Sequence, residues 1–182
     1  MYSIPDPEPT RMQGFYRLVY RPLDRLTTLV EQGLLTLCSL AILAAMLLTT
    51  VDVFLRYGFS RPLGWSFDFV MLYLMPAAYY MAFSYAMKIG AHLSVDFFAE
   101  ALPRRLLRVT YPVLLLLSAA LVLFIGDRIA EEAVESFRGG ETLFGSIQWL
   151  TWPTNAIISV SFLALAVRLL LVACRVAFFD EE

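Results

Sequence analysis

The strongest constraint in this 182-residue chain is a set of four long segments that carry no charged side chain. Each segment has between 18 and 26 residues, most of them apolar. A helix of roughly 17–25 apolar residues crosses a bilayer, and a backbone in lipid must satisfy its own hydrogen bonds. We therefore predict an all-α integral membrane protein with four transmembrane helices. The charge-free segments are residues 32–51, 69–87, 109–126 and 142–167.

The domain organisation follows from these four segments, because four helices and their connections use nearly the whole chain. The first apolar run comes late and has no small-residue cleavage site after it, so we expect a retained span and not a signal peptide. The predicted spans are about 30–52, 67–88, 108–127 and 150–173. The predicted regions are a cytoplasmic N-terminal segment at 1–28, a membrane domain at 29–176 and a cytoplasmic acidic tail at 177–182.

Two connecting segments have the pattern of short interfacial amphipathic helices. Residues 11–27 alternate apolar and arginine faces, with a kink or break expected at Pro22. The alternative is a basic flank that only sets the topology. After the second span, Ser94 fits the N-cap of a short helix that Pro103 ends.

The basic residues predict that both termini lie in the cytoplasm, because the excess of Lys and Arg stays on that side. Ten basic residues fall on one side of the predicted membrane and four on the other. The group of ten is Arg11, Arg17, Arg21, Arg25, Lys88, Arg104, Arg105, Arg108, Arg168 and Arg175. The group of four is Arg56, Arg61, Arg128 and Arg138.

The two external loops differ in character. The first, residues 52–66, is rich in aromatic and turn-forming residues; Ser66 is a candidate N-cap for the second span, with Asp68 in its first turn. The third loop of the chain, residues 127–149, is acidic and then glycine-rich. Residues 143–152 fit an interfacial start of the fourth helix, with Pro153 tolerated in its first turn.

The spans offer little chemistry. Their middles hold hydroxyl and amide side chains but no ionisable group, and such hydroxyls mostly bond to a helix backbone. The single histidine, His92, lies in a loop, which argues against a haem ligand or a hydrolase site. We expect no catalytic residue, cofactor or metal site, and the net charge of −2 gives no nucleic-acid footprint. The polar residues of the span middles are Thr36, Ser39, Thr49, Ser84, Ser118, Asn155, Ser159 and Ser161.

Two sequence elements resemble a known family. The stretch Arg56-Tyr57-Gly58-Phe59 with Pro62, Trp65 and Asp68 is similar to a first external loop, and Gly90-Ala91-His92-Leu93-Ser94-Val95-Asp96 with Leu102-Pro103-Arg104-Arg105 is similar to a cytoplasmic loop. Over roughly residues 30–170, they resemble the small, four-span DctQ-like subunit of tripartite ATP-independent periplasmic (TRAP) transporters. Asp68 and Leu93 stand where that family often has Glu and Ile, and both changes keep the chemistry.

The resemblance implies a non-catalytic subunit in the bacterial inner membrane. Its partners would be a large transport subunit, which moves an organic acid inward with sodium, and a periplasmic binding protein, which delivers that acid. His92 and Asp96 would organise the cytoplasmic turn, whereas Arg56, Tyr57 and Trp65 would fix the outer end of the first hairpin. The external glutamates Glu131, Glu132 and Glu135 are candidates for contact with the binding protein. The alternatives are a membrane anchor or scaffold of another complex, and a small transporter that works alone.

Overall fold

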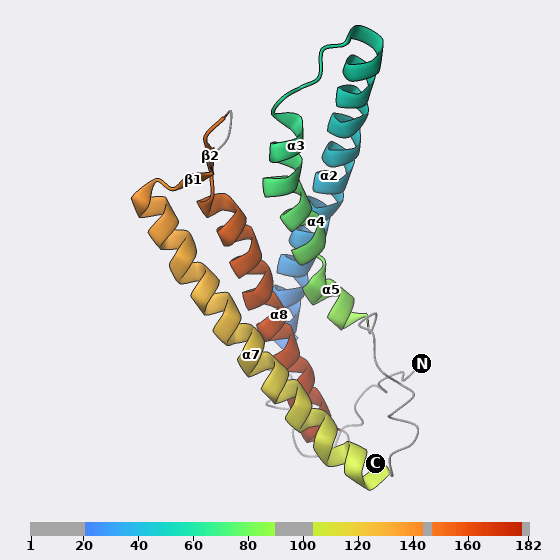
Figure 1. The fold of residues 1–182 in the computed structure, drawn as a ribbon. Coiled ribbons are helices and arrows are strands. Elements are labelled where there is room, and N and C mark those ends of the chain that lie inside the picture. Colours follow the sequence, from blue (N-terminus) through green and yellow to red (C-terminus); the bar gives the residue numbers. More distant parts are fainter. Residues whose placement is uncertain (1–20, 90–103, 144–146, 180–182) are drawn as a thin grey trace.

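The computed structural model describes residues 21–89, 104–143 and 147–179, and these form long helices (Figure 1). Four helical segments of the described residues are long and apolar enough to cross a membrane, which confirms the predicted all-α, four-span fold. The predicted interfacial helices lie mainly in residues 11–20 and 94–103, outside the described residues. The elements are α2 (Arg21–Phe59), α3 (Ser66–Phe69), the π-helix η2 (Val70–Leu74), α4 (Met75–Tyr80), α5 (Phe83–Lys88), α7 (Arg104–Gly139), β1 (Thr142–Leu143), β2 (Trp149–Leu150) and α8 (Trp152–Phe179).

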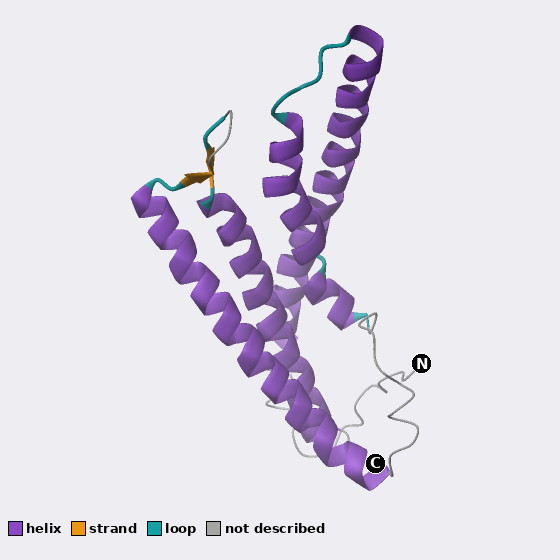
Figure 2. Ribbon diagram, viewed as in Figure 1, coloured by secondary structure: helices purple, strands orange, loops and turns teal. Residues whose placement is uncertain are grey.

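The helices form two hairpins that diverge toward one end of the molecule (Figure 1). One hairpin is α2 with the segmented second span α3–α5, and the other is α7 with α8. Helix α8 is central, because it packs on α7 and also contacts α5, α4 and α2. Helix α2 begins and α8 ends at the same side, and the α2–α3 and α7–α8 connections lie at the opposite side (Figure 2).

Helix α7 continues well beyond the predicted span, so the expectation of a loop from residue 127 is wrong up to residue 139. No proline or glycine interrupts residues 127–138, and charged residues such as Glu are good helix formers. The helix ends at Gly139, after which Gly140 takes a positive φ of 61°. The N–H of Glu141 donates to the carbonyl oxygen of Ser136, which is the hydrogen bond of a Schellman cap.

The connection from α7 to α8 also differs from the prediction. Residues 142–143 and 149–150 pair as two short antiparallel strands, and α8 begins only at Trp152. The expectation that residues 143–152 start the fourth helix is therefore wrong. Pro153 does lie in the first turn of α8, where its missing N–H has no helical partner to lose.

Helix α2 is longer than the predicted first span at both ends. Its described part starts at Arg21, with Pro22 in the first turn. The residues before Arg21 lie outside the described part of the chain, so the expected kink or break of an interfacial helix at Pro22 stays a prediction. Residues 21–27 continue directly into the membrane helix. At the outer end, α2 runs to Phe59 and stops where Ser60 takes a positive φ of 51°.

The second span is interrupted around Pro76, where a kink is expected. A proline removes the hydrogen bond to the carbonyl four residues earlier, here that of Leu72. A π-helix, η2, directly precedes the proline turn, and the hydroxyl of Thr154 on α8 donates to the Leu72 oxygen at 2.7 Å. At the next interruption, around Met81, the thiol of Cys38 lies 3.2 Å from the carbonyl oxygen of Ala78. Neighbouring helices thus supply donors where this span loses helical hydrogen bonds.

Small residues allow α7 and α8 to approach closely. A Cβ atom added to Gly126 would lie 3.2 Å from Cβ of Phe162, and the hydroxyl of Ser159 donates to the Gly126 carbonyl at 3.0 Å. Ala119 and Ala173 are almost fully buried in the same interface. Close packing of this kind drives helix association in membranes, where lipid is as apolar as the side chains.

Candidate functional site

The most unusual feature of the interior is a buried ion network between the two hairpins. Arg168, in the second half of α8, is only 3% exposed, and Glu31, in the first half of α2, is fully buried. Asp24, two turns before Glu31 on α2, is partly exposed and completes the network. Charged groups in a membrane domain are expensive and persist only when they are paired or face a polar region.

The guanidinium group of Arg168 bridges the two carboxylates. Its Nε lies 2.6 Å from Oε1 of Glu31, and its Nη2 contacts Oε2 of the same carboxylate, so the pair is bidentate. Its Nη1 lies 2.6 Å from Oδ1 of Asp24, and Nη2 also reaches the Thr28 hydroxyl at 3.3 Å. These four contacts use four of the five guanidinium N–H groups.

Two further side chains extend the network to the second span. Ser84 Oγ lies 2.6 Å from Oε1 of Glu31 and 3.2 Å from the carbonyl oxygen of Ala164; its one hydroxyl hydrogen serves the shorter contact. Lys88 donates to the same Thr28 hydroxyl at 3.0 Å. Two carboxylates and two cations are therefore linked, and the network is electrically neutral. Its buried charges, Glu31 and Arg168, are committed to each other and to Asp24.

Sequence reasoning missed this network. It assigned Arg168 to the cytoplasmic flanking charges and gave no role to Glu31 or Asp24. Glu31 lies immediately before one charge-free segment and Arg168 immediately after another, on the same predicted side of the membrane. Opposite charges at equal depth on two spans are the signal that could have revealed the pair.

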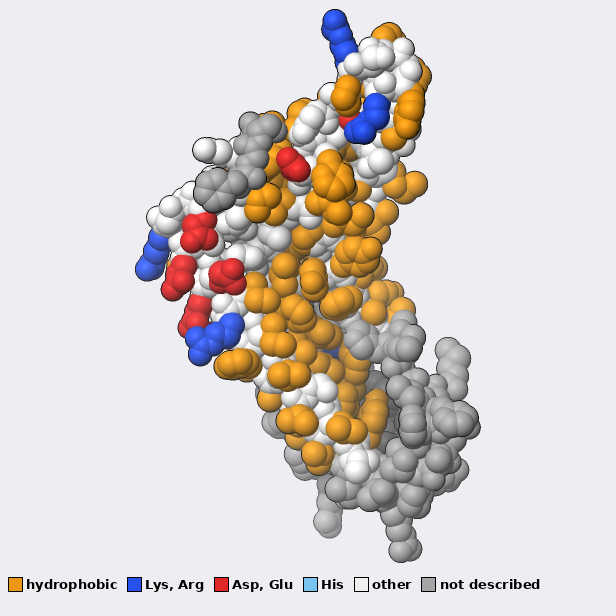
Figure 3. All heavy atoms as spheres, viewed as in Figure 1, with side chains coloured by type: hydrophobic (Ala, Val, Ile, Leu, Met, Phe, Trp, Pro, Cys, Tyr) orange, Lys and Arg blue, Asp and Glu red, His pale blue; other side chains and the backbone are white. Residues whose placement is uncertain are grey.

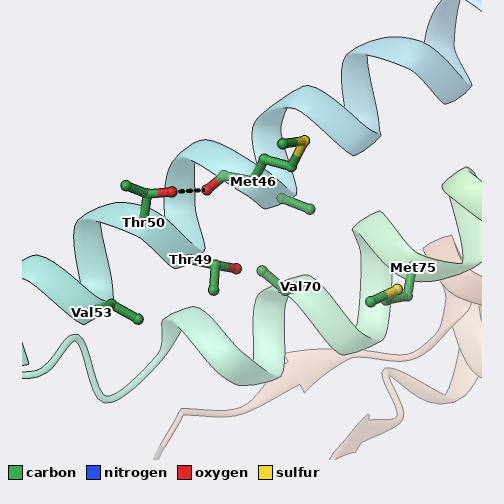
Figure 4. Close-up of a pocket in the computed structure, with 7 residues that line it drawn as sticks. Met46, Thr49, Thr50, Val53, Val70 and Met75 are labelled. Carbon is green, nitrogen blue, oxygen red and sulfur yellow. Dashed lines mark hydrogen bonds between the residues drawn. The ribbon is translucent and has the colours of Figure 1, made fainter.

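A second candidate site is an open groove of about 500 Å³ between α2 and the η2–α4 region (Figure 4). Two hydroxyls are its only polar side chains, and that of Thr50 donates to the carbonyl of Met46 within its own helix. The groove therefore has no group that could recognise an organic anion. Its lining residues are Ala45, Met46, Thr49, Thr50, Val53, Val70 and Met75.

The hydroxyls in the spans bond mainly to helix backbone, as expected. Thr36, Ser39 and Ser161 donate to the carbonyl four residues earlier, and Ser159 donates to the neighbouring helix. Ser84 is the exception, because it joins the ion network.

The predicted residues of the first external loop lie at the outer end of the α2–α3 hairpin. Arg56 donates to Asp52 at 2.8 Å, and the other oxygen of Asp52 accepts the backbone N–H of Leu63 at 2.7 Å. Asp52, which was not predicted, therefore ties the loop to α2. Tyr57 is 82% exposed, and Pro62 lies in the exposed loop.

Trp65 and its neighbours begin the second span differently from the prediction. Trp65, not Ser66, occupies the N-cap position of α3, so the predicted Ser66 cap is wrong. The Ser66 hydroxyl instead donates to the carbonyl of Leu63, which closes the preceding turn. Asp68 lies in the first turn of α3, as expected, where its negative charge interacts favourably with the positive end of the helix dipole.

The predicted residues of the cytoplasmic loop lie almost entirely outside the described part of the chain. Gly90, His92, Asp96 and Pro103 belong to residues 90–103. Arg104 is the first residue of α7. The proposed role of His92 and Asp96 therefore remains a prediction.

The outer turns of α7 carry the acidic residues that were suggested as a contact surface. Glu131, Glu132 and Glu135 are exposed, and Arg128 pairs with Glu131 at 2.7 Å. Charged side chains gather at this end of the molecule, whereas hydrophobic side chains dominate the middle of the face in Figure 3. This distribution fits a membrane-embedded middle and a solvated outer end.

Comparison with protein families gives one match. Residues 45–178 match the family described as tripartite ATP-independent periplasmic transporters, DctQ component. No curated protein and no solved structure matches the chain. The family match covers most of the chain and includes three of its four predicted spans and the outer half of the first.

Proposed function

Because the chain belongs to the DctQ component family of TRAP transporters, we propose that it is the non-catalytic small membrane subunit of such a system. It scaffolds the large membrane subunit during sodium-coupled uptake of an organic acid. A periplasmic binding protein delivers that acid. The chain lies in the bacterial inner membrane with both termini in the cytoplasm.

The observation that carries this proposal is the absence of a usable solute site in the described interior. The groups of the ion network satisfy one another, and the groove between α2 and η2–α4 is apolar. A transport site for an anion needs polar or charged groups that are free to bind it. Transport must therefore be carried out by a partner.

A scaffold role is supported by the large apolar surface of the spans. In each of the first three spans, only 11–17% of the most apolar 18-residue stretch is buried inside the chain. In the fourth span, the buried share is 44%. Helix α8 thus holds the chain together, while α2, α3–α5 and α7 present apolar faces outward. Lipid and the large subunit would cover these faces, and a rigid, wide frame would support a partner that moves.

Reconstitution tests the function directly. Liposomes that contain this chain alone should show no sodium-driven accumulation of organic acid, whereas liposomes with the large subunit, the chain and external binding protein should. Accumulation by the chain alone would reject the scaffold role. Failure of the chain to co-purify with the large subunit, together with a bound haem or quinone, would instead favour the anchor of another complex.

The orientation rests on the asymmetry of basic residues. Arg168 is neutralised inside the structure, but the remaining nine residues still exceed the four on the outer side. A reporter enzyme that works in the cytoplasm should be active when it is fused after Glu182, whereas one that requires the periplasm should be inactive. Activity of a reporter that requires the periplasm would reverse the assignment.

The roles of individual loop residues are proposals as well. His92→Ala and Asp96→Ala should weaken assembly with the large subunit and uptake, if the pair organises the cytoplasmic turn. Charge reversal of Glu131, Glu132 and Glu135 should lower the affinity for the binding protein. Wild-type behaviour of these variants would remove the corresponding roles.

A further inference from the structure

The inner halves of α2 and α8 are joined mainly by charge and by small side chains. The buried face of α2 consists of Thr27, Glu31, Leu34, Cys38 and Ala41. Only one of these five residues is a large apolar side chain. Small side chains let helices approach, but they present few knobs that fix how far one helix is shifted along the other.

We propose that the network of Asp24, Glu31 and Arg168 is a register lock, which fixes the position of α2 along α8. A bidentate arginine–carboxylate pair constrains both distance and orientation. Replacing a buried ion pair with apolar residues is often neutral for stability, and the best-attested use of such groups is to specify register. The lock therefore selects one packing of the two helices and adds no stability over an apolar core.

The residues around Glu31 explain how the lock works. A shift of one helical turn, about 5.4 Å, would place Arg168 opposite Thr27 or Leu34. Neither side chain can neutralise a guanidinium group, and in each shifted packing Arg168 can no longer bridge both Asp24 and Glu31, so at least one of these carboxylates loses its cation. The observed register is favoured because the packings shifted by one helical turn have a higher free energy.

The test is the double variant E31M/R168M, which removes both charges and keeps side chains of similar length. It leaves no buried hydrogen-bonding group without a partner: Ser84 can still donate to the Ala164 carbonyl, and Thr28 still accepts from Lys88. Asp24 loses its arginine but is partly exposed. The matched control is R128M/E131M, which removes an exposed ion pair of the same chemistry at the outer end of α7.

Cross-linking in membrane vesicles measures the register. In a C174S background, native Cys38 is paired with one of four α8 substitutions. Three of these positions face the interior (I157C, S161C and A164C), and the fourth is half exposed (V160C). The unmodified chain and R128M/E131M should cross-link predominantly at one interior position. In E31M/R168M, the yields at positions one turn apart should become comparable.

Each outcome decides the proposal. A wild-type cross-linking profile in E31M/R168M would overturn it, because register would then be set without the charges. Failure of this variant to fold would also overturn it, because the network would then be needed for stability and not only for register. The test uses the chain alone, so its result is independent of the scaffold function.

Discussion

The substitution Arg168→Met makes a sharp prediction, because it leaves Glu31 buried without a cation. Glu31 is fully buried, so water cannot replace the lost guanidinium group. Removing one partner of a buried ion pair costs roughly 3–5 kcal/mol, because the other charge is left buried and unpaired. We expect R168M to lower the free energy of unfolding by about 4 kcal/mol at pH 7.

Thermal unfolding in detergent micelles, followed by circular dichroism, measures the predicted loss. R168M should unfold roughly 8–16 °C below the unmodified protein at pH 7, using about 2–4 °C per kcal/mol.

A neutral isostere at position 31 isolates the cause. E31Q/R168M should recover most of the lost stability at pH 7, because the neutral amide needs no cation and its side-chain oxygen can still accept from Ser84. R128M, which breaks the exposed Arg128–Glu131 pair, should change the unfolding temperature little. The reasoning is refuted if R168M is as stable as the unmodified protein at pH 7, or if E31Q/R168M is no more stable than R168M.

Three further substitutions test the packing in the same unfolding assay. Gly126→Val should destabilise the protein by about 1–3 kcal/mol, because even a Cβ meets α8 at 3.2 Å; unchanged stability would mean that the α7–α8 contact is looser than the structure shows. Thr154→Val should cost about 1–3 kcal/mol by leaving the Leu72 carbonyl without its donor, and Thr36→Val, which removes only a hydroxyl bond within an exposed helix turn, should have little effect. Ser60→Gly should stabilise the protein by up to about 1 kcal/mol, since the residue has a φ of 51°; a loss of stability would contradict this account of the end of α2.

The fold was predictable because its main signal is local. Long charge-free runs report helices in lipid whatever surrounds them, and four such runs gave the four spans. The ends of the helices were not predictable in the same way. Charged residues were taken to mark the ends of the helices. They mark only where a helix leaves the hydrocarbon core of the membrane. Residues 127–139 show the difference, because they are charged and helical, and the helix stops at a glycine pair.

The ion network was not predictable from the pattern of any single helix. Glu31 and Arg168 are 137 residues apart in the chain, and their pairing depends on how α2 packs along α8. Asp52 was missed for a similar reason, since its carboxylate accepts a backbone N–H eleven residues later, across a turn. In both cases a charged residue beside an apolar run, which would be expected to face solvent, is bound to a specific partner.

The same contacts bear on the proposed scaffold role. Two deep polar groups are used between helices: Arg168 by Glu31 and Asp24, and the Leu72 carbonyl by Thr154. A transport site would require some of these groups to exchange a protein contact for a solute contact. Breaking the Arg168–Glu31 pair alone would cost roughly 3–5 kcal/mol, which a weakly bound solute with a millimolar Kd, worth about 4 kcal/mol, could barely offset. Polar groups committed in this way are suited to holding helices in fixed positions, which supports the proposal that another subunit binds the solute.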